Sequence, residues 1–238
     1  MTTATETGTV SVGELNAYLA RPAGGSARGM LLLPMITGIG AQLRDWADEL
    51  AARGVTALVW DPFHGVSSDD TSIEELMGLM QKFDDETCLA EQRALLDHLF
   101  GELGCTKAGV MGWCLGGRFA LLLGGVDNRV ANVVAYHPTV PGTPAPNHTL
   151  DAAEHTGRIE APALLIYPGA DTLVPVESFN RLQAALESRE HGATFVQLFP
   201  HAEHGFSAKA RQENPVNAEA FALSWPQALA LIDTTTAA

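Results

Sequence analysis

Short apolar segments alternate along this chain with longer segments in which apolar residues recur at helical spacing. Runs such as 29–34 and 55–60 are apolar almost throughout, which is typical of strands buried on both faces. Strands separated by helices predict an α/β fold with a mostly parallel, twisted sheet covered by helices on both faces. We expect about eight strands, with 9–19 as an edge strand or hairpin. The other predicted strands are 29–34, 55–60, 107–112, 130–136, 163–167 and 194–199, and the predicted helices are 41–53, 73–83, 85–103, 115–123, 176–189 and 218–232.

A length of 238 residues suits one large α/β domain or two small ones, and we expect a single domain spanning residues 1–238. Apolar residues make up 46% of the chain, which is enough for a sizeable core, and the formal net charge is −14. Such a charge disfavours nucleic acid and anionic membranes as partners. No apolar run reaches the roughly 18 residues of a membrane-spanning helix, and the polar start lacks signal-peptide features. We therefore expect a cytoplasmic protein and, without a coiled-coil pattern, a monomer.

One segment interrupts the alternation of strands and helices. Residues 137–161 contain four prolines and little periodicity. A loop of this length inside a compact domain is often a lid or a pocket wall. A solvated connection is the alternative interpretation.

The stretch Gly112-Trp113-Cys114-Leu115-Gly116 places a cysteine between two glycines, between a predicted strand and a predicted helix. This is the G-x-[Ser/Cys]-x-G pattern of the nucleophile elbow in α/β hydrolases. The helix N-terminus favours a thiolate, and the Leu115 amide is placed to donate to an oxyanion. The other two cysteines, Cys88 and Cys105, lie in apolar surroundings and are expected in the core. The three form neither a zinc pattern nor a disulfide framework, so no metal site is expected.

A cysteine nucleophile needs a base and a residue that orients the base. In this fold both follow later strands, the acid before the histidine. Asp171 follows the strand 163–167, and His204 follows the strand 194–199. Both are predicted to complete the triad, with His201 as the alternative base and an exposed turn residue as the alternative for Asp171.

The loop after the strand 29–34 is expected to supply the second oxyanion donor. The best candidate is the Ile36 backbone amide, with Met35 as the alternative. His64 and His137 follow strands that end at the same edge of the sheet. Either is a candidate for the pocket, and a structural role is the alternative for both.

Three motifs resemble those of the dienelactone hydrolase family of α/β hydrolases. They are G-W-C-L-G-G (112–117), P-G-A-D-T-L-V-P (168–175) and H-A-E-H-G-F (201–206), and the order of elements matches from about residue 8 to residue 232. The resemblance implies a Cys114–His204–Asp171 triad. It also implies hydrolysis of an ester or lactone through an acyl-cysteine, without a cofactor.

The chain also departs from that family at positions where the family carries charged residues. Met35 stands where the family carries a glutamate near the nucleophile, and Ala208 stands where it carries an arginine that grips the substrate carboxylate. A second family arginine has no match in 73–80. With Met35, Phe63, Trp113 and Phe206 expected in the pocket, these departures predict an uncharged or apolar small-molecule substrate. The alternatives are a broad carboxylesterase or thioesterase, and a catalytically idle ligand-binding or redox-sensing protein.

Overall fold

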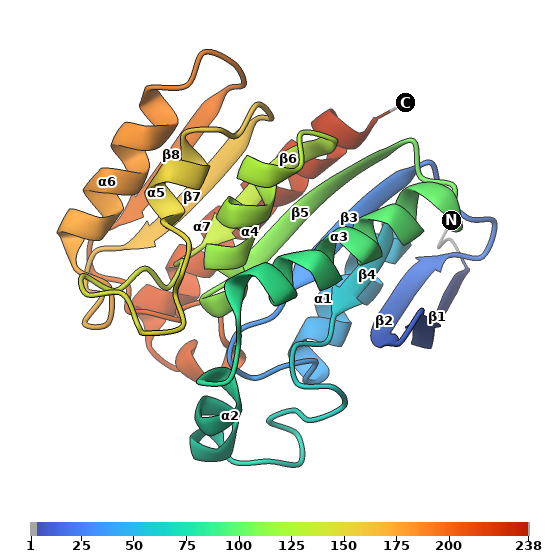
Figure 1. Ribbon diagram of the computed structural model, residues 1–238, viewed down its shortest axis with the longest axis horizontal. Coiled ribbons are helices and arrows are strands. Elements are labelled where there is room, and N and C mark those ends of the chain that lie inside the picture. The colour runs from blue at the N-terminus through green and yellow to red at the C-terminus, as the bar shows by residue number, and fades with distance from the viewer. Residues whose placement is uncertain (1–3, 238) are drawn as a thin grey trace.

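In the computed structural model, which describes residues 4–237, an eight-stranded sheet forms the centre of the molecule (Figure 1). The strand order is β1-β2-β4-β3-β5-β6-β7-β8. β2 runs antiparallel to both β1 and β4, and all strands from β4 to β8 in this order are parallel. The predicted mostly parallel α/β sheet is therefore confirmed. The strands are β1 (Thr5–Val12), β2 (Leu15–Pro22), β3 (Arg28–Leu33), β4 (Thr56–Trp60), β5 (Lys107–Trp113), β6 (Val130–Tyr136), β7 (Ala163–Pro168) and β8 (Thr194–Phe199).

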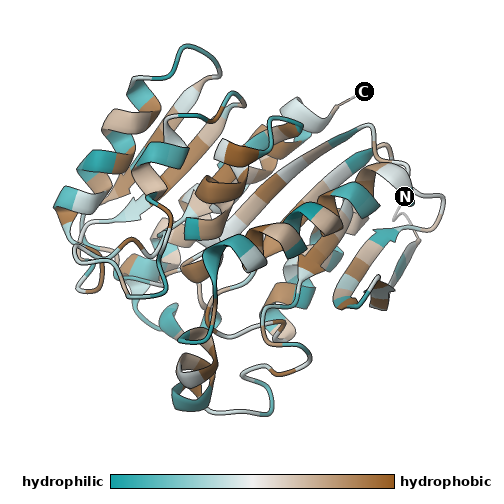
Figure 2. Ribbon diagram, viewed as in Figure 1, coloured by the Kyte–Doolittle hydropathy of each residue, from teal (hydrophilic) through white to brown (hydrophobic). Residues whose placement is uncertain are grey.

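Helices cover both faces of this sheet (Figure 1). Apolar residues of β3 alternate between the faces, since successive side chains of a strand point in opposite directions. Leu31 and Leu33 pack in the core beneath α3, α4 and α6, whereas Met30 and Leu32 pack beneath α1 and α7. Figure 2 shows hydrophobic residues concentrated along the central strands. The helices are α1 (Ala41–Ala52), α2 (Ile73–Met80), α3 (Asp85–Gly101), α4 (Leu115–Val126), α5 (Ala152–Thr156), α6 (Val176–Glu187) and α7 (Pro215–Thr236), with a 3₁₀ turn at Lys209–Arg211.

Several predicted boundaries differ from those observed. The N-terminal hairpin spans 5–22 and is longer than predicted. The closing helix begins at Pro215 because the Asn214 side chain caps it, accepting from the Val216 amide at 3.0 Å. The segment 137–161 contains the short helix α5, which periodicity did not reveal. No helix within residues 4–237 is both long and apolar enough to cross a membrane.

The α2 helix lies apart from the sheet, on the side where the parallel strands end (Figure 1). The Ser72 side chain caps its N-terminus. Leu76 is buried, whereas Ile73 and Met77 leave 44% and 49% of their surface exposed. α2 therefore presents an apolar face to the space outside the carboxyl edge of the sheet.

A buried ion pair ties three segments together beside that edge. Arg118 of α4 donates from Nη1 and Nη2 to the two carboxylate oxygens of Asp85 at 2.7 Å each. Arg118 also donates to the Leu150 carbonyl oxygen at 3.1 Å, and the Leu150 amide donates to Asp85 at 3.0 Å. Burial alone would raise the pKa of Asp85, but the Arg118 hydrogen bonds and charge lower it. The pair thus anchors the 137–161 segment to α3 and α4.

We expect Arg118→Met to lower the free energy of unfolding by about 3–5 kcal/mol, because it leaves the Asp85 carboxylate buried without its partner. Urea unfolding measures the change. The matched control is Arg158→Ala, which removes an exposed pair with Glu154, four residues earlier in the chain, and should cost at most about 0.5 kcal/mol. Equal unfolding midpoints for the two variants would contradict the structural role of the buried pair.

Candidate active site

Cys114 lies at a sharp turn between β5 and α4. Its backbone has φ 54° and ψ −112°, a conformation that L-residues rarely adopt. The two flanking glycines are required by close packing. A Cβ atom at Gly116 would lie 2.0 Å from the Leu33 carbonyl oxygen, and one at Gly112 would lie 2.0 Å from the Gly116 carbonyl oxygen. This local geometry is that of a nucleophile elbow, with the thiol held at the N-terminus of α4.

The structure brings Cys114, His204 and Asp171 together from the ends of three strands. His204 Nε2 lies 3.2 Å from Cys114 Sγ, and His204 Nδ1 lies 2.7 Å from Asp171 Oδ2. The Asp171 side chain is only 1% exposed, so it is not a solvated turn residue. The alternative base, His201, is exposed to solvent. The three side chains form a continuous hydrogen-bonded chain from carboxylate to sulfur.

The second Asp171 oxygen fixes the loop that carries this residue. Oδ1 accepts hydrogen bonds from the backbone amides of Leu173 at 2.8 Å and Val174 at 2.9 Å. The carboxylate is therefore held at both oxygens, one by its own turn and one by His204. Such a fixed acceptor sets the tautomer and the orientation of the imidazole.

The electrostatics of the pair favour a thiolate. Burial alone would raise the pKa of the Cys114 thiol, but hydrogen bonding to His204 and its charge lower it. Burial would likewise lower the pKa of His204, but its bonds to Asp171 and Cys114 raise it to about 9. The two shifts describe one coupled thiolate–imidazolium pair. Burial raises the pKa of Cys88 to about 12 and that of Cys105 to about 11, so both remain thiols at neutral pH.

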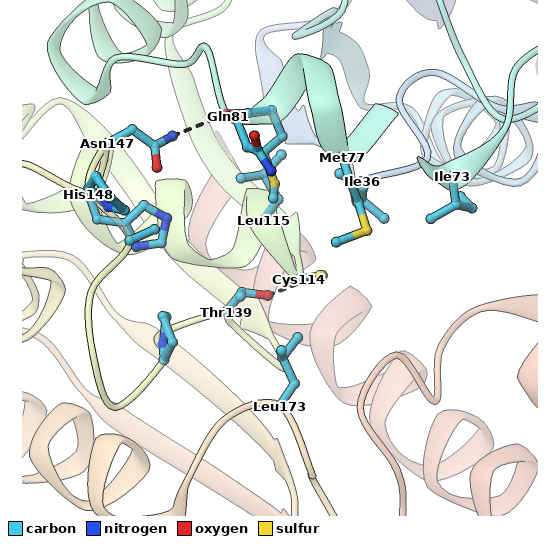
Figure 3. Close-up of a pocket in the computed structure, with 14 residues that line it drawn as sticks. Ile36, Ile73, Met77, Gln81, Cys114, Leu115, Thr139, Asn147, His148 and Leu173 are labelled. Carbon is cyan, nitrogen blue, oxygen red and sulfur yellow. Dashed lines mark hydrogen bonds between the residues drawn. The ribbon is translucent and has the colours of Figure 1, made fainter. Parts of the chain in front are cut away.

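A cavity of about 590 Å³ opens beside the Cys114 sulfur (Figure 3). A volume of this size is typical of sites for small molecules. Among residues 4–237, no lysine, arginine, aspartate or glutamate lines it. Most of the lining residues are apolar, and a few carry polar side chains. They are Ile36, Ile73, Met77, Met80, Gln81, Cys114, Leu115, Thr139, Pro141, Ala145, Pro146, Asn147, His148 and Leu173.

The two residues predicted to supply oxyanion donors, Ile36 and Leu115, both line this cavity next to Cys114 (Figure 3). The backbone amide of Leu115 helps to lower the pKa of the Cys114 thiol. The Ile36 amide has no hydrogen-bond partner among residues 4–237. Both residues border the cavity that Cys114 also lines, and the action of their amides on an oxyanion stays a prediction.

The six side chains predicted to line the pocket do not line this cavity, and that prediction is corrected. Trp113 directly precedes Cys114 in the chain and therefore points to the opposite face of the sheet. There it is buried and stacks on Trp46, with ring centroids 4.5 Å apart. Met35 and Phe206 pack in the same cluster beneath α1 and α7.

The other three predicted pocket residues also lie outside this cavity. Phe63 is buried, and together with His64 it borders a separate cavity near α3. His137 is fully buried, and its Nε2 lies 2.7 Å from the Ser207 hydroxyl. Its ring meets the His204 ring edge-on at 5.2 Å. Burial holds the pKa of His137 well below its usual range, so it supports His204 as a neutral ring.

Sequence reasoning missed several of the residues that form the cavity wall. Ile73, Met77 and Met80 come from α2, and Leu173 comes from the turn after β7. Their helical or apolar pattern gave no sign of a binding role. The segment 137–161 supplies six of the lining residues, including Thr139 and His148, so it is a wall of the cavity. Movement of this wall as a lid stays a prediction. Within residues 4–237, no cluster of three or more His, Cys, Asp or Glu side chains is arranged to hold a metal ion.

Comparison with known families decides where the chain belongs. The sequence profile of the dienelactone hydrolase family matches residues 15–236. The chain belongs to the dienelactone hydrolase family. It is therefore a hydrolase of the carboxylic ester class, and the resemblance noted in its motifs is confirmed.

Individual relatives agree with this assignment. A carboxymethylenebutenolidase of Rhodococcus opacus is 28% identical over 205 residues, which cover 84% of this chain and 79% of that protein. A candidate carboxymethylenebutenolidase of Salmonella typhi is 28% identical over 211 residues, 83% of this chain and 75% of that protein. The crystal structure of a candidate dienelactone hydrolase from Klebsiella pneumoniae superposes with a TM-score of 0.83 at 24% identity. That superposition covers 96% of this chain and 98% of the other, and it shows the shared fold.

Proposed function

We propose that this protein hydrolyses an uncharged ester or lactone through an acyl intermediate on Cys114. The observation that carries the proposal is the hydrogen-bonded series Asp171–His204–Cys114 at the wall of a cavity that no Lys, Arg, Asp or Glu of residues 4–237 lines. Family membership supports the hydrolytic chemistry, and the cavity supports the choice of substrate.

The proposed reaction begins with the thiolate–imidazolium pair. Cys114 Sγ attacks the substrate carbonyl carbon, and the resulting oxyanion is stabilised by the Leu115 and Ile36 amides. The tetrahedral intermediate collapses, the carbon–oxygen bond to the leaving group breaks, and the His204 Nε2 proton passes to the departing alkoxide. A water molecule, deprotonated by His204, then attacks the thioester and releases the carboxylic acid. Asp171 holds the imidazole and stabilises its protonated form throughout.

The lining of the cavity bears on the charge of the substrate. A carboxylate transferred from water into an apolar site is costly unless a cation or several hydrogen-bond donors meet it. Among residues 4–237, the polar side chains on the cavity wall besides Cys114 are those of Gln81, Asn147, Thr139 and the neutral ring of His148. Burial lowers the pKa of His148, with the Arg118 charge behind it, so this ring does not supply a positive charge at neutral pH. These features favour a neutral substrate over an anionic one.

A panel of matched esters tests the proposal. We expect p-nitrophenyl butyrate to be hydrolysed with a kcat/KM at least about tenfold above that of p-nitrophenyl hemisuccinate, since about 1.4 kcal/mol of uncompensated charge burial suffices for that ratio. A neutral aliphatic lactone, measured beside a neutral thioester, separates a lactonase from a broad esterase or thioesterase. A higher kcat/KM for the hemisuccinate would overturn the neutral-substrate proposal. Absence of turnover across the panel would instead favour a ligand-binding protein.

A further inference from the structure

The hydroxyl of Thr139 lies against the Cys114 sulfur. The distance between Thr139 Oγ1 and Cys114 Sγ is 3.0 Å, which is short for a contact involving sulfur (Figure 3). Thr139 lies in the loop directly after β6, at the start of the cavity wall. No role for this residue follows from the three catalytic motifs.

Backbone hydrogen bonds hold Thr139 in register with the elbow. The Thr139 amide donates to the Cys114 carbonyl oxygen at 2.9 Å, and the Cys114 amide donates to the Tyr136 carbonyl oxygen at 3.0 Å. Between these two bonds the chain turns at His137, whose φ is 34°. A main-chain hydrogen bond thus holds Thr139 beside Cys114. The hydroxyl contact therefore belongs to the structure of the elbow.

The Thr139 hydroxyl makes one hydrogen bond among the described residues. Within 4–237, Thr139 Oγ1 has no hydrogen-bond partner other than the Cys114 sulfur. A thiolate can only accept hydrogen bonds, so a hydroxyl beside it acts as the donor. His204 Nε2 approaches the same sulfur at 3.2 Å. The titratable groups near the sulfur are His204 and, behind that ring, Asp171 and neutral His137. His148, on the wall of the same cavity, is a neutral ring because burial lowers its pKa.

We propose that Thr139 is a donor that holds the Cys114 thiolate in its resting position through the Oγ1–Sγ hydrogen bond. The inference rests on the proposed role of Cys114 as nucleophile and adds a residue to it. The bond is strongest in the thiolate, because hydrogen bonds to charged groups are stronger than those to neutral ones. It weakens once the sulfur carries an acyl group, since a thioester sulfur is a poor acceptor. Thr139 therefore favours ionisation of the resting thiol and releases the sulfur on acylation.

The pH dependence of alkylation tests this role without requiring turnover. Iodoacetamide reacts with the thiolate, and Cys88 and Cys105 are buried thiols with raised pKa values, so the reaction reports on Cys114. We expect Thr139→Val, which keeps the side-chain shape, to shift the midpoint of the rate–pH profile upward by about one pH unit. The rate at the high-pH plateau should stay the same or rise, because the thiolate loses a donor. Thr139→Ser should restore the original midpoint.

Thr143→Val is the matched control, since Thr143 lies in the same loop, is exposed and does not line the cavity. Its midpoint should equal that of the unaltered protein. An unshifted midpoint in folded Thr139→Val, or failure of Thr139→Ser to restore a shifted one, would overturn the proposal. A shifted midpoint together with no hydrolysis of any ester would leave the role of Thr139 standing and refute the proposed function instead.

Discussion

Cys114→Ala is expected to lower kcat/KM for p-nitrophenyl butyrate by at least about 10⁴-fold. The variant removes the sulfur atom on which the acyl intermediate is proposed to form. The oxyanion donors and the cavity remain, so a small residual rate above the reaction in water is expected. Steady-state kinetics measure the loss. Mass spectrometry of the unaltered protein, quenched early in turnover, should show one acyl group on the Cys114 peptide.

The matched control for this substitution is Cys105→Ala. Cys105 is buried against Gly29 of β3. It lies just before β5 begins, at the end of that strand opposite the elbow. Its loss should leave kcat/KM within about twofold, with only the modest loss of stability expected of a small core truncation. If Cys114→Ala retained the activity of the Cys105→Ala control, the cysteine mechanism would be wrong.

Asp171→Asn should lower kcat by about 10⁴-fold while leaving the protein folded. The amide oxygen of asparagine still accepts from the Leu173 and Val174 backbone amides, as Oδ1 does in the unaltered protein. The amide NH₂ then faces His204 Nδ1, where Oδ2 accepted before. Two donors cannot face each other, so the imidazole adopts the tautomer with its proton on Nε2. That nitrogen can no longer take the Cys114 proton.

Kinetics together with a second variant separate this mechanism from loss of structure. Asp171→Ala removes the acceptor for both backbone amides and should also lower the unfolding midpoint in urea, whereas Asp171→Asn should not. The exposed Asp97→Asn is the control for removing one negative charge, and its kcat should be unchanged. Full activity of Asp171→Asn would rule out orientation of His204 by this carboxylate.

The alternation of apolar strands and helical segments was sufficient to predict the parallel sheet. Strand–helix patterns record burial on one or both faces, and this information is local. The observed β5–Cys114–α4 turn follows in the same way, since glycines at 112 and 116 are needed wherever strand and helix approach this closely. Helix ends were less accurate, because the cap at Asn214 depends on one side-chain hydrogen bond rather than on periodicity.

The cavity shows where local patterns stop being informative. Trp113 is adjacent to Cys114 in sequence, yet it points to the opposite face and stacks on Trp46. Met77 and Leu173 are distant from Cys114 in sequence, yet both line the cavity that Cys114 borders. Apolar residues are equally suited to a core and to a pocket wall, so only their position in space separates the two uses.

By itself, the sequence determined the fold class and the three residues of the candidate triad. These depend on periodicity, on the glycines of the elbow and on the order in which Cys114, Asp171 and His204 follow their strands. Only the tertiary structure decided what surrounds the sulfur. The Thr139 hydroxyl reaches it because two loops after neighbouring parallel strands, β5 and β6, are joined by backbone hydrogen bonds. Contacts of this kind depend on which strands lie side by side, and strand order is a property of the folded chain.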